Sequence, residues 1–197
     1  MIVCKTYNFG NRGRFGIALE LTLDPEIYGK DWLHGSACYW IDGQCIGEGM
    51  LYDISLSYDV LGEIENIIEK KSFSCSKDIF DADAKQLLQI MDKDMENEVD
   101  DIVEENCFGF VGTYDFWEKF EIHWQLDIMA EDMILLFEHE TQARIIVAKL
   151  DKKKNIWKFR SEHLLNAEEV QAVFQEACDW LRQRCRQEGV LLDCDKK

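Results

Sequence analysis

The sequence predicts an α+β fold, with a mostly antiparallel sheet of about five to seven strands and three main helices. Two observations predict this class. Apolar residues alternate with polar ones in two separate parts of the chain, whereas helical spacing occurs mid-chain and near the C-terminus. Strands that follow strands, with helices gathered separately, are typical of α+β rather than of alternating α/β proteins.

The first strands are predicted between residues 17 and 46. Apolar residues alternate over 17–23, and the pattern stops before Pro25, which has no backbone donor for a ladder. Two further apolar runs flank Asp42-Gly43. This dipeptide favours the tight primed turn of a hairpin, because that turn needs positive φ at both positions.

Two helices are predicted in the middle of the chain. Residues 60–68 carry apolar side chains at helical spacing, and a second helix is expected over about 83–105. The apolar stripe of this second helix consists of Leu88, Met91, Met95, Val99 and Ile102. A loop over residues 107–113 follows it.

Strands are predicted again at 120–128, 133–137, 143–148 and 156–159, where apolar residues alternate or form short runs between polar turns. A closing helix follows. Asn166 is its expected N-cap and Gly189 its expected C-cap. Its buried stripe includes Cys178, and Cys185 lies on the same side, so both thiols are expected to be buried and inert.

The chain shows no repeat and no Gly/Ser linker, so one domain over residues 1–197 is predicted, with an acidic helical segment at about 78–105. The 39 acidic residues exceed the 22 lysines and arginines, and the net charge is −17. This charge argues against nucleic acid or an anionic membrane as partner, and favours a basic protein. The start of the chain lacks an apolar signal segment, which predicts a cytoplasmic protein with reduced cysteines.

The sequence carries no recognisable enzyme motif, and we expect no catalytic residue, no metal and no cofactor. None of the four histidines is spaced from another His or Cys like a metal-ligand pair. A hydrolase or metal-dependent site assembled from dispersed acids and histidines stays an alternative, because such groups can meet only in the fold.

The acidic segment is the predicted partner-binding surface. Residues 78–105 contain eleven acids and two lysines. A helical wheel places Asp94, Asp101 and Glu105 on one flank, opposite the apolar stripe, and Glu96, Asp100 and Glu104 on the other. Trp117 is added as an exposed anchor, because tryptophan is enriched at interface hot spots.

Two stretches resemble a known family. Phe15-Gly-Ile-Ala-Leu-Glu-Leu21 and the hairpin region from Trp32 to Gly47 are similar to the Immunity protein 42 family, which has an FAIE-like strand followed by a Trp-containing W-I-N-G-Q hairpin. The helix around residues 56–68 also fits, whereas residues 74–114 match poorly. The resemblance implies an antidote from a bacterial polymorphic-toxin or contact-dependent inhibition system, and it implies no contact residue.

Together these observations predict a non-catalytic immunity protein that neutralises a basic, nuclease-type toxin C-terminal domain by occlusion. Two alternatives stay open: the small hydrolase or metal-dependent enzyme, and an acidic adaptor that binds a basic cellular protein.

Overall fold

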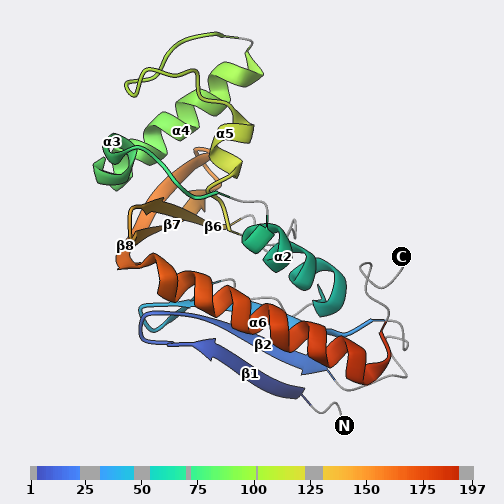
Figure 1. Ribbon diagram of the computed structural model, residues 1–197. Helices are drawn as coiled ribbons and strands as arrows, with labels where there is room; N and C mark the ends of the chain where they lie inside the picture. The colour runs from blue at the N-terminus through green and yellow to red at the C-terminus, as the bar shows by residue number, and fades with distance from the viewer. Residues whose placement is uncertain are drawn as a thin grey trace. The chain divides into compact units, whose positions relative to one another are not determined.

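The computed structural model describes residues 4–22, 32–46, 54–69, 72–100, 102–122 and 131–190. These residues form two antiparallel sheets, of five and three strands, and five α-helices, three of which are long (Figure 1). The predicted α+β class and its three main helices are therefore confirmed. The strands divide between two sheets because the chain packs as two compact units.

The first unit contains residues 1–70, 124–128 and 168–197. Its strands are β1 (Cys4–Gly10), β2 (Phe15–Thr22), β3 (His34–Ile41) and β4 (Gln44–Ile46), hydrogen-bonded in that order, and β5 (Ile54–Ser55) also pairs with β3. The predicted hairpin is confirmed: Asp42 and Gly43 have φ of 49° and 75° and join β3 to β4. Strand β1 was not predicted.

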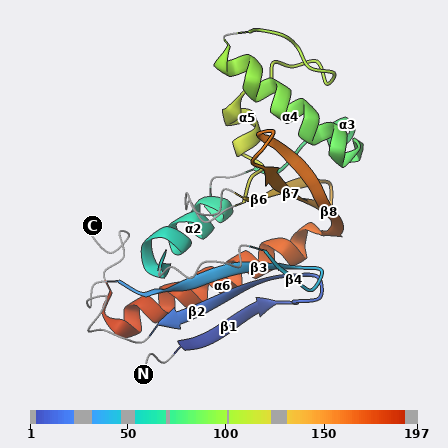
Figure 2. The same ribbon diagram turned by 180° about the vertical axis from the view of Figure 1, so that it is seen from behind.

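The long helix α6 (Ala167–Glu188) lies along one face of this sheet, as Figures 1 and 2 show from opposite sides. Its predicted stripe is buried from Val170 to Leu181. The Phe174 ring lies 5.6 Å from the ring of Phe15 and 6.3 Å from that of Tyr39. Gly189, with φ of 72°, ends the helix as predicted, because a positive φ suits glycine.

A shorter helix completes the first unit. A π-helical turn, η1 (Leu56–Val60), leads into α2 (Leu61–Glu69), and together they match the helix predicted over 60–68. Arg182 of α6 donates to Glu65 of α2 across 2.8 Å and so connects the two helices.

The second unit contains residues 71–123 and 129–167. The strands β6 (Asp132–His139), β7 (Gln142–Asp151) and β8 (Ile156–Asn166) form a meander, which confirms the last three predicted strands. The strand predicted over 120–128 is described only at 120–122, where Glu121 makes an isolated bridge to Leu135 of β6.

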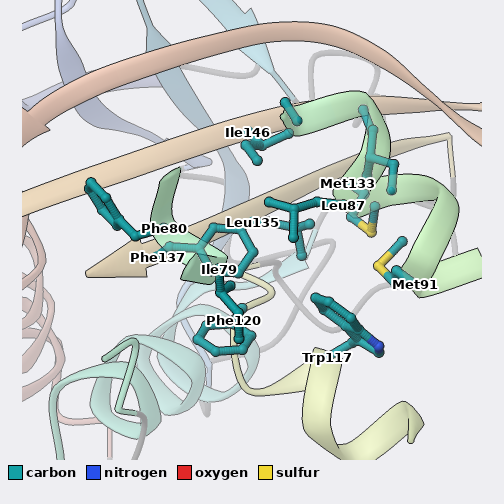
Figure 3. Close-up of a cluster of buried hydrophobic side chains, with 13 residues drawn as sticks. Ile79, Phe80, Leu87, Met91, Trp117, Phe120, Met133, Leu135, Phe137 and Ile146 are labelled. Carbon is teal, nitrogen blue, oxygen red and sulfur yellow. The ribbon is translucent and has the colours of Figure 1, made fainter. Parts of the chain in front are cut away.

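Three helices pack on this meander: α3 (Lys77–Asp81), α4 (Ala84–Val99) and α5 (Tyr114–Glu118). Figure 3 shows their shared core, in which Leu87 and Met91 of α4 lie with Leu135 and Phe137 of β6. The prediction of one domain over 1–197 stays a prediction beside this division into two units.

Candidate interaction surface

The acidic helix is shorter than predicted. Helix α4 ends at Val99, with Asp100 as its C-cap, instead of continuing to residue 105. The charge of the last turn gives a physical reason. Glu96 and Glu98 lie near the negative end of the helix macrodipole, and no basic residue of that turn offsets them.

Beyond α4 the chain folds back along the helix. Ile102 N–H donates to the Asn97 carbonyl across 2.7 Å, and Lys93 forms an ion pair with Glu104 at 3.3 Å. Tyr114 N–H, at the start of α5, donates to the Glu98 carboxylate. These contacts tie the segment after α4 to the end of the helix, and we call residues 96–100 and 102–114 the acidic tip.

Apolar side chains are unusually exposed on the acidic tip. Val99 and Val103 are 84% and 82% exposed, and Ile102, Val111 and Tyr114 also lie open to solvent. The prediction that Val99 and Ile102 continue the apolar stripe of the helix against the core is wrong, because Val99 is the exposed last residue of α4 and Ile102 lies beyond the helix end. Contiguous exposed apolar residues bordered by polar ones are typical of protein-binding surfaces.

Acidic residues flank these apolar residues in the sequence. The predicted contact residues Glu96, Asp100, Glu104 and Glu105 are all exposed. The ion pair between Lys93 and Glu104 is exposed on both sides, so its contribution to stability is small. Asp101 lies outside the described residues. The acidic tip thus combines negative charge with exposed apolar area.

Asp94 was placed wrongly on the solvent-exposed flank of the helix. Its side chain belongs to a residue only 3% exposed, and its Oδ2 accepts hydrogen bonds from Trp117 Nε1 at 3.0 Å and Asn106 Nδ2 at 2.9 Å. A Cβ at Gly112 would lie 1.7 Å from the same oxygen. Asp94 therefore fastens the returning loop to α4 instead of facing a partner.

The expectation that Trp117 is an exposed anchor is also wrong. The residue is 1% exposed, and Figure 3 shows its ring beside Met91 in the core cluster. Thr113 caps α5 by accepting from Phe116 N–H at 3.2 Å, and this short helix turns the indole inward. The spacing of Asp94, seven residues after Leu87 and three after Met91, is the signal that places it on the buried side.

Burial shifts the pKa of two titratable groups elsewhere in the second unit. Burial raises the pKa of Asp92 to about 6, partly opposed by a hydrogen bond from Trp157 N–H. Burial likewise raises the pKa of the Cys75 thiol to about 11, so it stays protonated and a weak nucleophile at neutral pH.

The first unit shows the same behaviour at Cys178, where burial again raises the thiol pKa to about 11, as the prediction of inert buried thiols required. Within the described ranges, no three His, Cys, Asp or Glu side chains are grouped as metal ligands. No helix in those ranges has the length and apolar character needed to cross a membrane.

Comparison with known proteins supplies the remaining finding. A family model described as Immunity protein 42 matches residues 1–180. The crystal structure of CdiI from Burkholderia dolosa AUO158 has a similar fold, with a TM-score of 0.58 and 14% sequence identity over 88% of this chain and 99% of that chain. No curated protein matches the chain.

Proposed function

The chain belongs to the Immunity protein 42 family, and we propose that it binds and neutralises a cognate toxin domain in the bacterial cytoplasm. The family match over residues 1–180 carries this proposal. The fold similarity to a protein named CdiI, which covers nearly all of that chain, supports it. We further propose that the protein acts by binding alone, without catalysis.

We propose that the toxin domain is basic and of nuclease type, and that the acidic tip contacts it. Domains that bind nucleic acid carry positive surfaces. A protein of net charge −17 attracts such a surface over long range. Opposite charges mainly raise the association rate and set orientation, and they contribute less to affinity.

The exposed apolar side chains of the acidic tip would supply the binding energy that charge alone does not. Binding energy concentrates at apolar groups that become fully buried in the centre of an interface. Val99 and Val103 are almost fully exposed in the free protein and therefore have the most area to lose on binding. The surrounding carboxylates would form the rim of that interface. Docking at this surface would occlude the toxin domain.

The first experiment is co-expression of this protein with the toxin domain encoded beside it, scoring survival and recovery of a 1:1 complex. Survival together with a complex is the expected result. Cell death without any complex would refute the proposal. Recovery of many unrelated basic proteins without toxin neutralisation would instead favour an acidic adaptor.

A matched pair of variants tests the binding surface separately. Glu96→Lys with Asp100→Lys reverses two exposed charges of the acidic tip, and Glu168→Lys with Glu176→Lys reverses two exposed charges of α6. Both change the net charge equally. We expect the tip variant to slow association at low salt by roughly tenfold or more, and the α6 variant to slow it much less. Equal rates for both variants would exclude the acidic tip while leaving the immunity function intact.

A further inference from the structure

Two cysteines face each other across the β3–β4 hairpin. The Sγ atoms of Cys38 and Cys45 lie 2.7 Å apart. Non-bonded carbon atoms rest about 3.5–4.0 Å apart, and sulfur is larger, so these thiols are in unusually close contact. The separation is within about 1 Å of the roughly 2.04 Å length of a disulfide bond.

The hairpin geometry explains the contact. Trp40 pairs with Cys45 across the two strands, so Cys38 is the diagonal neighbour of Cys45 on the same face. Diagonal neighbours usually have Cα atoms about 7–8 Å apart, slightly beyond disulfide range. Among the described residues, β4 is three residues long and pairs with β3, so a small inward shift of β4 can close the difference.

The surroundings favour reaction at this pair. Tyr39, the neighbour of Cys38, packs on Phe174 of α6, so Cys38 and Cys45 point to the opposite face of the sheet. Both are partly exposed. The guanidinium of Arg12 lies 4.8 Å from the ring of Trp40, the residue that pairs with Cys45 across the hairpin.

Other described cysteines lack one of these features. Cys178 and Cys185 lie on the buried face of α6. Cys75 has the raised thiol pKa noted above. Cys107 is exposed, but among the described residues it contacts no second thiol.

We propose that Cys38 and Cys45 form a redox-active pair that a low-molecular-weight disulfide converts reversibly into an intramolecular disulfide. One thiolate attacks the small disulfide, whose S–S bond breaks as one small thiol leaves. The second cysteine then attacks the protein sulfur of the mixed disulfide and expels the other small thiol. Two protein thiols are oxidised by two electrons, the small disulfide is reduced to two thiols, and those thiols take up both protons.

Glutathione redox buffers test this proposal on the full chain. The protein is equilibrated at several ratios of oxidised to reduced glutathione, acid-quenched, denatured and alkylated with N-ethylmaleimide. We expect a product that has lost two hydrogens in mass and carries two fewer labels than the reduced chain. Peptide mapping should link residues 38 and 45, and dithiothreitol should restore both labels. A product that stops at glutathione adducts, or that links other cysteines, would overturn the proposal.

Serine variants identify the roles of the two sulfurs. Cys45→Ser should trap a stable glutathione adduct on Cys38, because the resolving thiol is gone. Cys107→Ser is the matched control, and it should oxidise like the wild type. An intramolecular disulfide that persists in the Cys45→Ser variant would contradict the assignment. Peptide mapping of the wild-type protein decides the question even where a variant folds poorly.

Discussion

Replacing Asp94 with alanine should loosen the acidic tip from its helix. The carboxylate accepts from both Trp117 Nε1 and Asn106 Nδ2, at 3.0 and 2.9 Å. Alanine leaves both donors without this acceptor, and an unsatisfied buried donor costs about 1–3 kcal/mol. Removing a buried carboxylate also removes its desolvation penalty, which offsets part of this loss. We therefore expect the free energy of unfolding to fall by about 2–4 kcal/mol.

Urea denaturation followed by circular dichroism measures this change. Asp94→Asn keeps an acceptor oxygen of similar size, so it should lose less stability than Asp94→Ala. Glu105→Ala is the control, because this exposed acid lies on the same surface, and it should change stability by no more than about 0.5 kcal/mol. An alanine variant at Asp94 as stable as the Glu105→Ala control would refute the structural role given to this carboxylate.

Two further predictions concern backbone packing and pH. Gly35→Ala should destabilise the protein by at least about 2 kcal/mol, because overpacking commonly costs about 1–3 kcal/mol and the added Cβ would lie 1.8 Å from the Glu20 carbonyl oxygen. Gly62→Ala is the control, because Gly62 lies in a helix and nothing is near the added Cβ. This control should stabilise the protein by about 0.5–1 kcal/mol. Equal changes in melting temperature for Gly35→Ala and Gly62→Ala would contradict this prediction. The pKa of Asp92 is about 6 in the folded protein and about 4 in an unfolded chain, so folding favours the protonated carboxyl. The free energy of unfolding of the wild type should therefore fall, relative to that of Asp92→Asn, as the pH rises from about 4 through 6. Parallel stability curves for these two proteins between those pH values would show that the Asp92 pKa is not raised.

Sequence patterns predicted the elements whose determinants are local. The Asp42-Gly43 turn follows from the two positive φ values that a primed turn requires. Helix α6 was predicted from its apolar spacing and from Gly189, and its buried stripe agrees. The meander of β6 to β8 follows from alternating or short apolar runs separated by polar turns. Each of these signals lies within a few neighbouring residues.

The errors arise where distant segments decide the outcome. Strand β1 has few apolar residues and is fixed by pairing with β2 along its full length. Asp94 and Trp117 are far apart in the sequence, and only the returning loop brings the carboxylate and the indole together. A polar residue beside an apolar stripe has two possible environments, solvent or a buried donor. The spacing of Asp94 from Leu87 and Met91 indicates which side of the helix it occupies, but the helical wheel does not show the donor, because Trp117 belongs to another element.

Under the proposed function, the composition of the acidic tip favours binding at the expense of the stability of the free protein. Acids at the end of α4 oppose the helix macrodipole, and the exposed side chains of Val99 and Val103 gain nothing from the core. These acids and valines lower the stability of the free protein, and both groups would interact favourably with a basic, partly apolar partner. The buried Asp94 holds the loop that presents them, so less conformational freedom is lost on binding. The proposed function thus assigns two roles within one acidic segment: the buried Asp94 carboxylate orders the surface, and the exposed carboxylates contact the partner.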